Sequence, residues 1–127
     1  MAAAVSLPDS FFGNKKSRPQ WIDEITDSKL LSPKKRDALS AAIWESALVQ
    51  VAWCEPAEID RLNILHASLK SMREALWPFA GAAQVVLVDG HIDPYKGKES
   101  LPNEAKSRGF VEVLPLVKGD QKSVSIA

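Results

Sequence analysis

The sequence predicts an α/β protein with a mixed β-sheet flanked by helices. Residues 85–88 form a short valine-rich run, which is typical of a buried central strand. Between residues 59 and 76, apolar side chains recur every three or four positions, which is typical of an amphipathic helix. Predicted strands and helices alternate along most of the chain, and this alternation favours an α/β architecture.

The composition is that of an ordinary globular domain. A chain of 127 residues fits one domain, which we assign to residues 1–127. Lys plus Arg and Asp plus Glu are both 16, so the overall charge gives no signal for nucleic acid. Cys54 is the single cysteine, which excludes an internal disulfide and suggests a small core residue. The sequence has no convincing signal peptide and no apolar stretch of membrane-spanning length, so we expect a cytoplasmic protein without a membrane partner.

The first third of the chain contains one predicted strand and one predicted helix. Residues 2–7 are apolar and predict an inner strand that lacks an upstream neighbour, whereas residues 8–23 predict a polar surface loop. Ser32 is expected to cap a helix that begins at Pro33, because serine caps well and proline suits the first helical position. The apolar face of this helix comprises Leu39, Ala42, Ile43 and Ala47.

A second strand and a longer helix follow. Residues 49–54 predict the strand, and Pro56 opens the helix after Glu55, which is a weak cap. Pro78 ends the helical region, because proline disfavours helix in the residue before it. The apolar stripe of this helix comprises Ile59, Leu62, Leu65, Leu69, Met72 and Leu76. We expect its members from Leu62 to Leu76 to be mostly buried against the sheet.

The last third contains two predicted strands. The strand at 85–89 is followed at 91–109 by a long polar excursion, which is typical of functional or mobile segments. Residues 111–117 predict the next strand, in which Pro115 suits an edge position or a bulge. Residues 123–127 resemble the first turn of a helix.

Two aspartates follow predicted strands. Asp89 ends the predicted strand at 85–89, and Asp120 follows the last predicted strand. Gly90, which comes directly after Asp89, can end a strand because glycine adopts backbone angles that other residues resist. Open α/β sheets bind ligands at the carboxyl ends of their strands, and paired carboxylates there suit Mg²⁺, a hard cation that prefers oxygen. Both residues fit equally well as turn aspartates. Their spacing leaves the two interpretations open.

Several segments resemble bacterial ribonuclease HII, and they occur in the order found in that family. Residues 26–36 (Thr-Asp-Ser-Lys-Leu-Leu-Ser-Pro-Lys-Lys-Arg) resemble the segment after its second strand. Residues 55–65, which begin Glu-Pro, resemble its central helix. The Leu-Val-Asp-Gly at 87–90 and the Val-Lys-Gly-Asp-Gln-Lys-Ser at 117–123 complete the set. The Ala-Ala-Ala-Val at 2–5 is similar to the second strand of the family.

The resemblance implies a ribonuclease H-like mixed β-sheet flanked by helices. It also implies an endonuclease that uses Mg²⁺ or Mn²⁺ to cleave the RNA strand of RNA–DNA hybrids, including single ribonucleotides in duplex DNA. By the same resemblance, Asp89 and Asp120 are catalytic and metal-binding, and the protein is a monomer when complete. Lys29, Lys118 and Lys122 are the candidate substrate contacts. Each of these lysines also fits a solvated surface residue.

The sequence departs from the family pattern in one respect that affects chemistry. The family carries an Asp-Glu-x-Gly-Arg-Gly motif on its first strand, and this chain contains no such motif. Asp23 and Glu24 form an acidic pair, but Ile-Thr-Asp follows it and it lies after the alanine strand, so we do not transfer the role. We therefore expect a partial catalytic domain, incomplete at both ends.

Two functions remain open at this point. The chain either belongs to an active ribonuclease HII or is a catalytically dead fragment that retains some nucleic-acid binding. An unrelated nucleotide-binding α/β domain is disfavoured, because the sequence has no glycine-rich loop that could cradle a phosphate.

Overall fold

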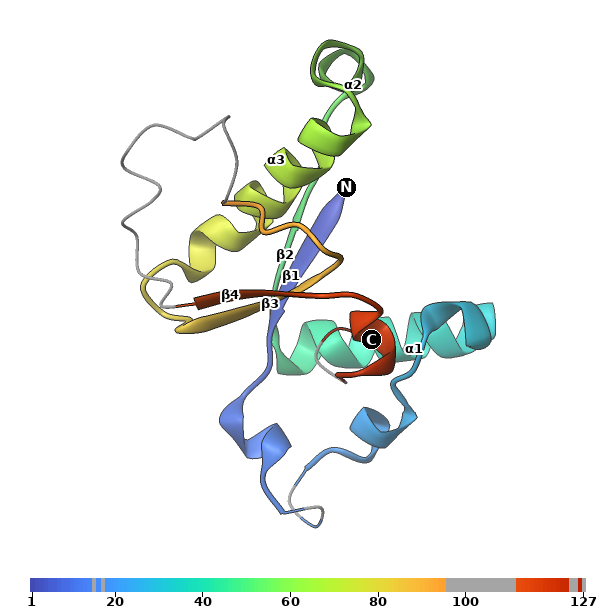
Figure 1. Cartoon of the computed structure of the whole chain (residues 1–127). Helices are drawn as coiled ribbons and strands as arrows, with labels where there is room; N and C mark the ends of the chain where they lie inside the picture. The colour runs from blue at the N-terminus through green and yellow to red at the C-terminus, as the bar shows by residue number, and fades with distance from the viewer. Residues whose placement is uncertain (15, 17, 96–111, 124–125, 127) are drawn as a thin grey trace.

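The computed structural model describes residues 1–14, 16, 18–95, 112–123 and 126, and its elements follow the predicted order (Figure 1). The strands are β1 (Ala2–Ser6), β2 (Leu48–Ala52), β3 (Val85–Asp89) and β4 (Glu112–Leu116). The helices are α1 (Pro33–Ser46), α2 (Pro56–Leu62) and α3 (Ile64–Leu76). The α/β class predicted from the sequence is confirmed.

The strands pair in both directions but form two separate sheets. β1 and β2 are antiparallel, with Ala4 opposite Gln50, whereas β3 and β4 are parallel, with Asp89 opposite Leu116. The parallel and antiparallel pairings of the predicted mixed sheet are therefore both present, distributed over two 2-stranded sheets. In Figure 1 the β1–β2 pair crosses the direction of the β3–β4 pair.

Helix α1 begins where its capping residues predict. The Ser32 side chain accepts a hydrogen bond from the Lys35 backbone N–H at 3.3 Å, and Pro33 occupies the first turn. The serine oxygen thereby satisfies one of the backbone donors that a helix start leaves unpaired. Leu39 on the predicted apolar face is buried, with 7% of its surface exposed.

The single long helix predicted after Glu55 is in fact two helices. Asn63 separates them with φ 67° and ψ 164°, backbone angles that a helix does not contain. Its side chain accepts a hydrogen bond from the His66 backbone N–H at 3.1 Å and so caps α3. The apolar repeat continues across this break, which is why periodicity alone did not reveal it. α3 ends at Leu76, as the following Trp-Pro pair predicted.

The buried face of α3 is narrower than the predicted stripe. Its buried residues are small and spaced by four: Ala67, Ser71 and Ala75, which are at most 2% exposed. Leu65 is 47% exposed, so its predicted burial was wrong. The remaining stripe residues, Ile59, Leu62, Leu69, Met72 and Leu76, are half-buried. Small side chains allow a helix backbone to approach the strands closely, and the larger residues then flank the contact instead of filling it.

The core lies between α3 and the antiparallel pair. Ala4 of β1, Ala75 of α3 and Phe79 form one buried cluster. Next to it, the buried thiol of Cys54 donates to the Ala67 carbonyl at 3.3 Å and accepts from the Ser71 hydroxyl at 3.4 Å. The expectation that Cys54 is a small core residue is therefore confirmed.

Parts of the last third of the chain lie outside the described residues. Of the polar excursion at 91–109, only residues 91–95 are described, and Arg73 of α3 donates a hydrogen bond to the Pro94 carbonyl there at 3.0 Å. Pro115 lies in β4 opposite Val88, in a pair whose strands are both outer strands, which agrees with its predicted edge position. The helical turn expected at 123–127 is mostly outside the described residues.

Candidate metal and nucleic-acid site

The first candidate ligand, Asp89, ends strand β3. Gly90 follows with φ 126°, a backbone angle that glycine adopts without strain, as the sequence predicted. The Gly90 N–H donates to the Leu116 carbonyl at 3.1 Å and closes the parallel pair at this edge. Asp89 is therefore held at the carboxyl edge of the pair, with its side chain exposed.

The second candidate ligand, Asp120, comes to the same edge through a tight turn. Because β3 and β4 are parallel, their carboxyl ends lie together. After β4 the chain passes through Lys118, which has left-handed angles of φ 56° and ψ 49°. This turn leads into the 3₁₀ turn Gly119–Gln121, where Asp120 is half-exposed. Non-glycine residues with positive φ are uncommon and often occur at functional sites.

Gly119 connects the two strand ends directly. Its backbone N–H donates to Asp89 Oδ1 at 3.1 Å, so the residue before Asp120 holds the Asp89 carboxylate. A Cβ on Gly119 would lie 3.3 Å from the same oxygen and 2.7 Å from Ile126 Cδ1, so a side chain at this position would force the Ile126 side chain to shift. Sequence reasoning missed this role. The glycine of the Lys-Gly-Asp segment was the only signal that could have indicated it.

The donor set at this edge fits a hard divalent cation. Magnesium in phosphoryl-transfer sites is bound through one or two carboxylates, and its other ligands are water and substrate phosphate. Asp89 and Asp120 provide two carboxylates of this kind. No group of three or more His, Cys, Asp or Glu residues that could hold a metal ion occurs in the described part of the chain. A cation here would therefore take its remaining ligands from water and substrate.

The candidate substrate lysines are all exposed. Lys118 and Lys122 flank Asp120 in sequence and belong to the same edge. Lys29 lies elsewhere, in the 3₁₀ turn Ser28–Leu30 before α1, where its backbone N–H donates to Asp27 Oδ1 at 3.0 Å. Asp27 thus has a local structural role in this turn. Within the described residues, no hydrogen bond or ion pair joins the Lys29 side chain to the two candidate acids.

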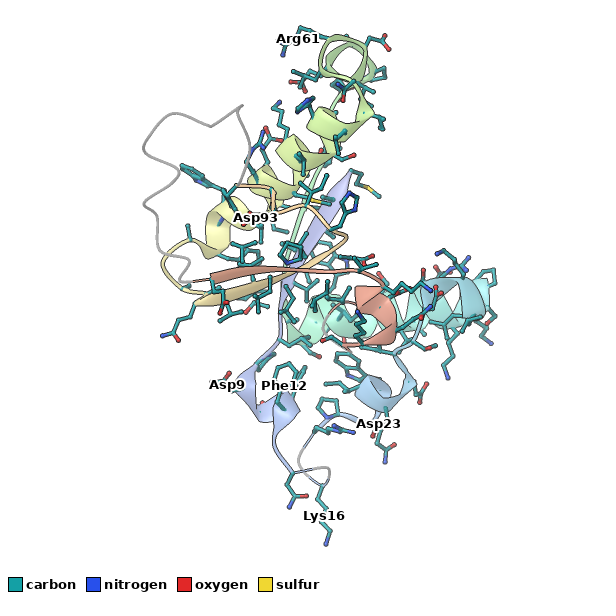
Figure 2. All side chains as sticks on the ribbon, in the orientation of Figure 1. Asp9, Phe12, Lys16, Asp23, Arg61 and Asp93 are labelled. Carbon is teal, nitrogen blue, oxygen red and sulfur yellow. The ribbon has the colours of Figure 1, made fainter. Side chains whose placement is uncertain are left out.

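The acidic pair in the first loop is engaged away from this edge. Asp23 forms an ion pair with Arg18, and Glu24 Oε2 lies 2.5 Å from Lys35 Nζ. Figure 2 shows Asp23 below α1, well separated from β3 and β4. Both contacts give the acidic pair a structural role in this loop, away from the candidate cation site.

The fold and this edge define an α/β protein with a candidate divalent-cation site. Comparison with known proteins then gives the family that the chain resembles. It is 38% identical over 128 residues to ribonuclease HII of Neisseria gonorrhoeae, which covers 99% of the chain and 55% of that protein. It is 40% identical over 133 residues to ribonuclease HII of Fusobacterium nucleatum, covering 100% of the chain and 52% of that protein.

A third relative extends the same result. Ribonuclease HII of Sinorhizobium fredii is 39% identical over 128 residues, covering 100% of the chain and 46% of that protein. The resemblance to bacterial ribonuclease HII is therefore confirmed along the whole chain, and the chain spans about half the length of the relatives it matches. No protein-family model matches the chain. None of the described helices has the length and apolar composition needed to cross a membrane.

Proposed function

We propose that this chain is part of a ribonuclease HII that hydrolyses the RNA strand of RNA–DNA hybrids, including single ribonucleotides in duplex DNA, and leaves 5′-phosphate ends. The similarity to ribonuclease HII along the whole chain supports the reaction class. The observation that carries the site is the hydrogen bond from Gly119 to Asp89, because it fixes one acid beside the turn that bears the other. We place the protein in the cytoplasm, as a monomer when complete.

Each group at the edge has a distinct part in the proposed reaction. Asp89 and Asp120 would hold Mg²⁺ or Mn²⁺, which supplies an activated water and polarises a phosphoryl oxygen when bound. The Gly119 N–H keeps the Asp89 carboxylate in one orientation, so that less reordering is needed when a cation binds. Lys118 and Lys122 offset phosphate charge beside the acids, while Lys29 contacts the nucleic-acid backbone farther away. Such contacts position the duplex without reading its sequence.

A second candidate function is a nucleic-acid-binding remnant without catalysis. The absence of an Asp-Glu-x-Gly-Arg-Gly motif from the sequence favours it. Glycine and arginine of that motif would be needed to recognise the ribose 2′-hydroxyl, the group that distinguishes RNA from DNA. On this basis we expect the 127-residue chain alone to bind phosphate backbones weakly and to cleave nothing.

One experiment separates the two candidates. The chain is substituted for the aligned region of the Neisseria gonorrhoeae ribonuclease HII, and this chimera and the isolated chain are assayed on a duplex with one ribonucleotide, with Mg²⁺ and with Mn²⁺. We expect the chimera to nick the duplex and leave a 5′-phosphate, and the isolated chain to leave it intact. A chimera that melts cooperatively but does not nick would contradict the enzymatic proposal. Metal-dependent nicking by the isolated chain would contradict the remnant.

A further inference from the structure

Arg73 of α3 contacts the segment that leaves the candidate cation site. Its Nη1 donates a hydrogen bond to the Pro94 carbonyl at 3.0 Å, although the two residues are 21 positions apart. Pro94 is buried, and so is Asp93, which is 9% exposed. Figure 2 shows Asp93 beside α3. The chain therefore passes from the edge of the parallel pair to α3 within a few residues after Asp89.

This segment is also fixed locally where it meets α3. The Asp93 carboxylate accepts a hydrogen bond from the Tyr95 backbone N–H at 2.8 Å, which closes a turn around Pro94. Tyr95 is half-buried, and burial raises the pKa of its phenol above the ordinary value, whereas the nearby charge of Arg73 opposes this rise. The Arg73 guanidinium therefore lies close to the whole turn and not to the Pro94 carbonyl alone.

The chain between the site and this turn is short. At the site, the Gly90 N–H donates to the Leu116 carbonyl at 3.1 Å, and at the turn Arg73 holds Pro94. Pro94 is the fourth residue after Gly90, so the connection spans at most about 14 Å at about 3.5 Å per residue. Because Asp89 directly precedes Gly90, an anchor at Pro94 restricts the positions that the Asp89 backbone can occupy.

We propose that Arg73 is a positioning residue for the candidate cation site. It holds the Pro94 carbonyl, and the short segment between Gly90 and Pro94 transmits this constraint to Asp89, whose carboxylate stays beside Gly119. Arg73 acts through Asp89 and not by contact with the cation. The inference rests on the proposed function, because it gives Arg73 a part in binding the same cation.

Amide hydrogen exchange tests this role without any metal ion. In the metal-free 127-residue chain, exchange is followed by NMR at Gly119, whose N–H donates to Asp89, and at Ala67, whose N–H donates to the Asn63 carbonyl at the start of α3. We expect Arg73→Met, or independently Arg73→Gln, to accelerate exchange at Gly119 at least about fivefold and to leave exchange at Ala67 unchanged. Arg73→Lys keeps a long side chain with a donor for the carbonyl, so it should restore part of the protection.

The matched control is Arg61→Met, because the Arg61 side chain is 71% exposed on α2. It should change neither exchange rate. Equal acceleration at Gly119 and Ala67 would mean that Arg73 merely stabilises α3, and it would overturn the proposal. An unchanged exchange rate at Gly119 in both Arg73 variants would overturn it as well.

Cation binding provides a second readout. The Mn²⁺ affinity of the 127-residue chain, measured by electron paramagnetic resonance, should fall at least about threefold in Arg73→Met and stay unchanged in Arg61→Met, because residues that orient a metal ligand affect metal affinity. In the chimera, Arg73→Met should raise the Mg²⁺ concentration for half-maximal nicking by a similar factor and leave the maximal rate within about twofold.

The outcomes separate this inference from the proposed function. An unchanged chain that binds Mn²⁺, together with an Arg73→Met variant of equal affinity, would contradict the role of Arg73 alone. An inactive chimera, together with weakened Mn²⁺ binding in Arg73→Met, would contradict the enzymatic proposal alone. If the unchanged chain bound no Mn²⁺, the cation site and the role of Arg73 would both be contradicted.

Discussion

The two strand pairs of this protein differ in what surrounds them. The antiparallel β1–β2 pair lies against α3, where Ala4 and Ala75 are 9% and 1% exposed (Figure 1). The parallel β3–β4 pair buries Val86 and Val88 on one face, but Leu87 on the other face is 37% exposed. The first pair therefore provides the core and the second carries the candidate site. Stability and chemistry are assigned to different regions, and each can be perturbed separately.

The largest effect is expected at the carboxyl edge of the parallel pair. In the active chimera, Asp89→Asn should lower the rate of nicking by more than about 1,000-fold. The reason is that Asp89 and Asp120 would act as one unit in holding the cation, so the loss of either carboxylate removes most of the activity. Hybrid binding should remain, since the lysines still attract the phosphates. The rate is measured at saturating Mg²⁺ on a duplex with one ribonucleotide. Asp60→Asn, which changes an exposed acid on α2, is the control. Near-normal nicking by Asp89→Asn would remove this residue from the site.

The next effect is expected in the core of the antiparallel pair. Phe79→Ala removes a ring that is 7% exposed and should lower the free energy of unfolding by about 3–5 kcal/mol. Phe12→Ala is the matched control, because Phe12 is 60% exposed and its loss should cost less than about 0.5 kcal/mol. Denaturant titrations compare the two variants. Equal losses would mean that the core does not lie at the end of α3.

The contact between the two strand ends can be probed at Gly119. A Cβ there would lie 2.7 Å from Ile126 Cδ1, so Gly119→Ala should cost about 1–3 kcal/mol of unfolding free energy through overpacking. The additional substitution Ile126→Ala should recover part of this loss, because it removes the clashing atoms. If the double variant loses as much stability as the two single variants together, or more, the clash is not the cause.

The smallest effect is expected at an ion pair that joins α2 and α3. Lys70 Nζ lies 2.5 Å from Glu58 Oε1, and this hydrogen bond lowers the pKa of Glu58 and raises the pKa of Lys70 from their ordinary values. The contribution of Glu58 is complete above its unfolded pKa and is lost as the pH falls through its folded pKa. Glu58→Gln should therefore lower the melting temperature slightly at pH 7 and leave it unchanged near pH 2. The same small decrease at both pH values would contradict this linkage.

Local signals in the sequence account for most of the elements. Ser32 and Pro33 predicted the start of α1, and Pro78 predicted where α3 ends, because caps and proline act within a few residues. The break at Asn63 was not predictable from the apolar repeat. The sequence also predicted the wrong buried face for α3, because small residues and not Leu65 are buried there. The helix lies close to β1, which favours small side chains at the contact. That closeness is a tertiary property that the apolar repeat does not report.

The candidate site was predictable in part. Asp89 and Asp120 follow strands, so the sequence placed them at strand ends, and the parallel pairing brings these ends to one edge. The hydrogen bond that Gly119 donates to Asp89 joins residues 30 positions apart and depends on the close approach of two segments. The separation of the strands into two pairs is likewise a long-range arrangement, which local patterns do not report.

We propose that Asp89 and Asp120 share one cation, and Mn²⁺ binding to the 127-residue chain, measured by electron paramagnetic resonance, tests this most directly. We expect Asp89→Asn and Asp120→Asn each to weaken binding at least about tenfold. The double variant should lose little more Mn²⁺ affinity than either single variant, because the two carboxylates would bind the same ion. Asp60→Asn should bind as the unchanged chain does. A shared site would be contradicted if either single variant bound Mn²⁺ with undiminished affinity. It would also be contradicted if the double variant lost affinity by the product of the two single losses, as expected for two independent sites.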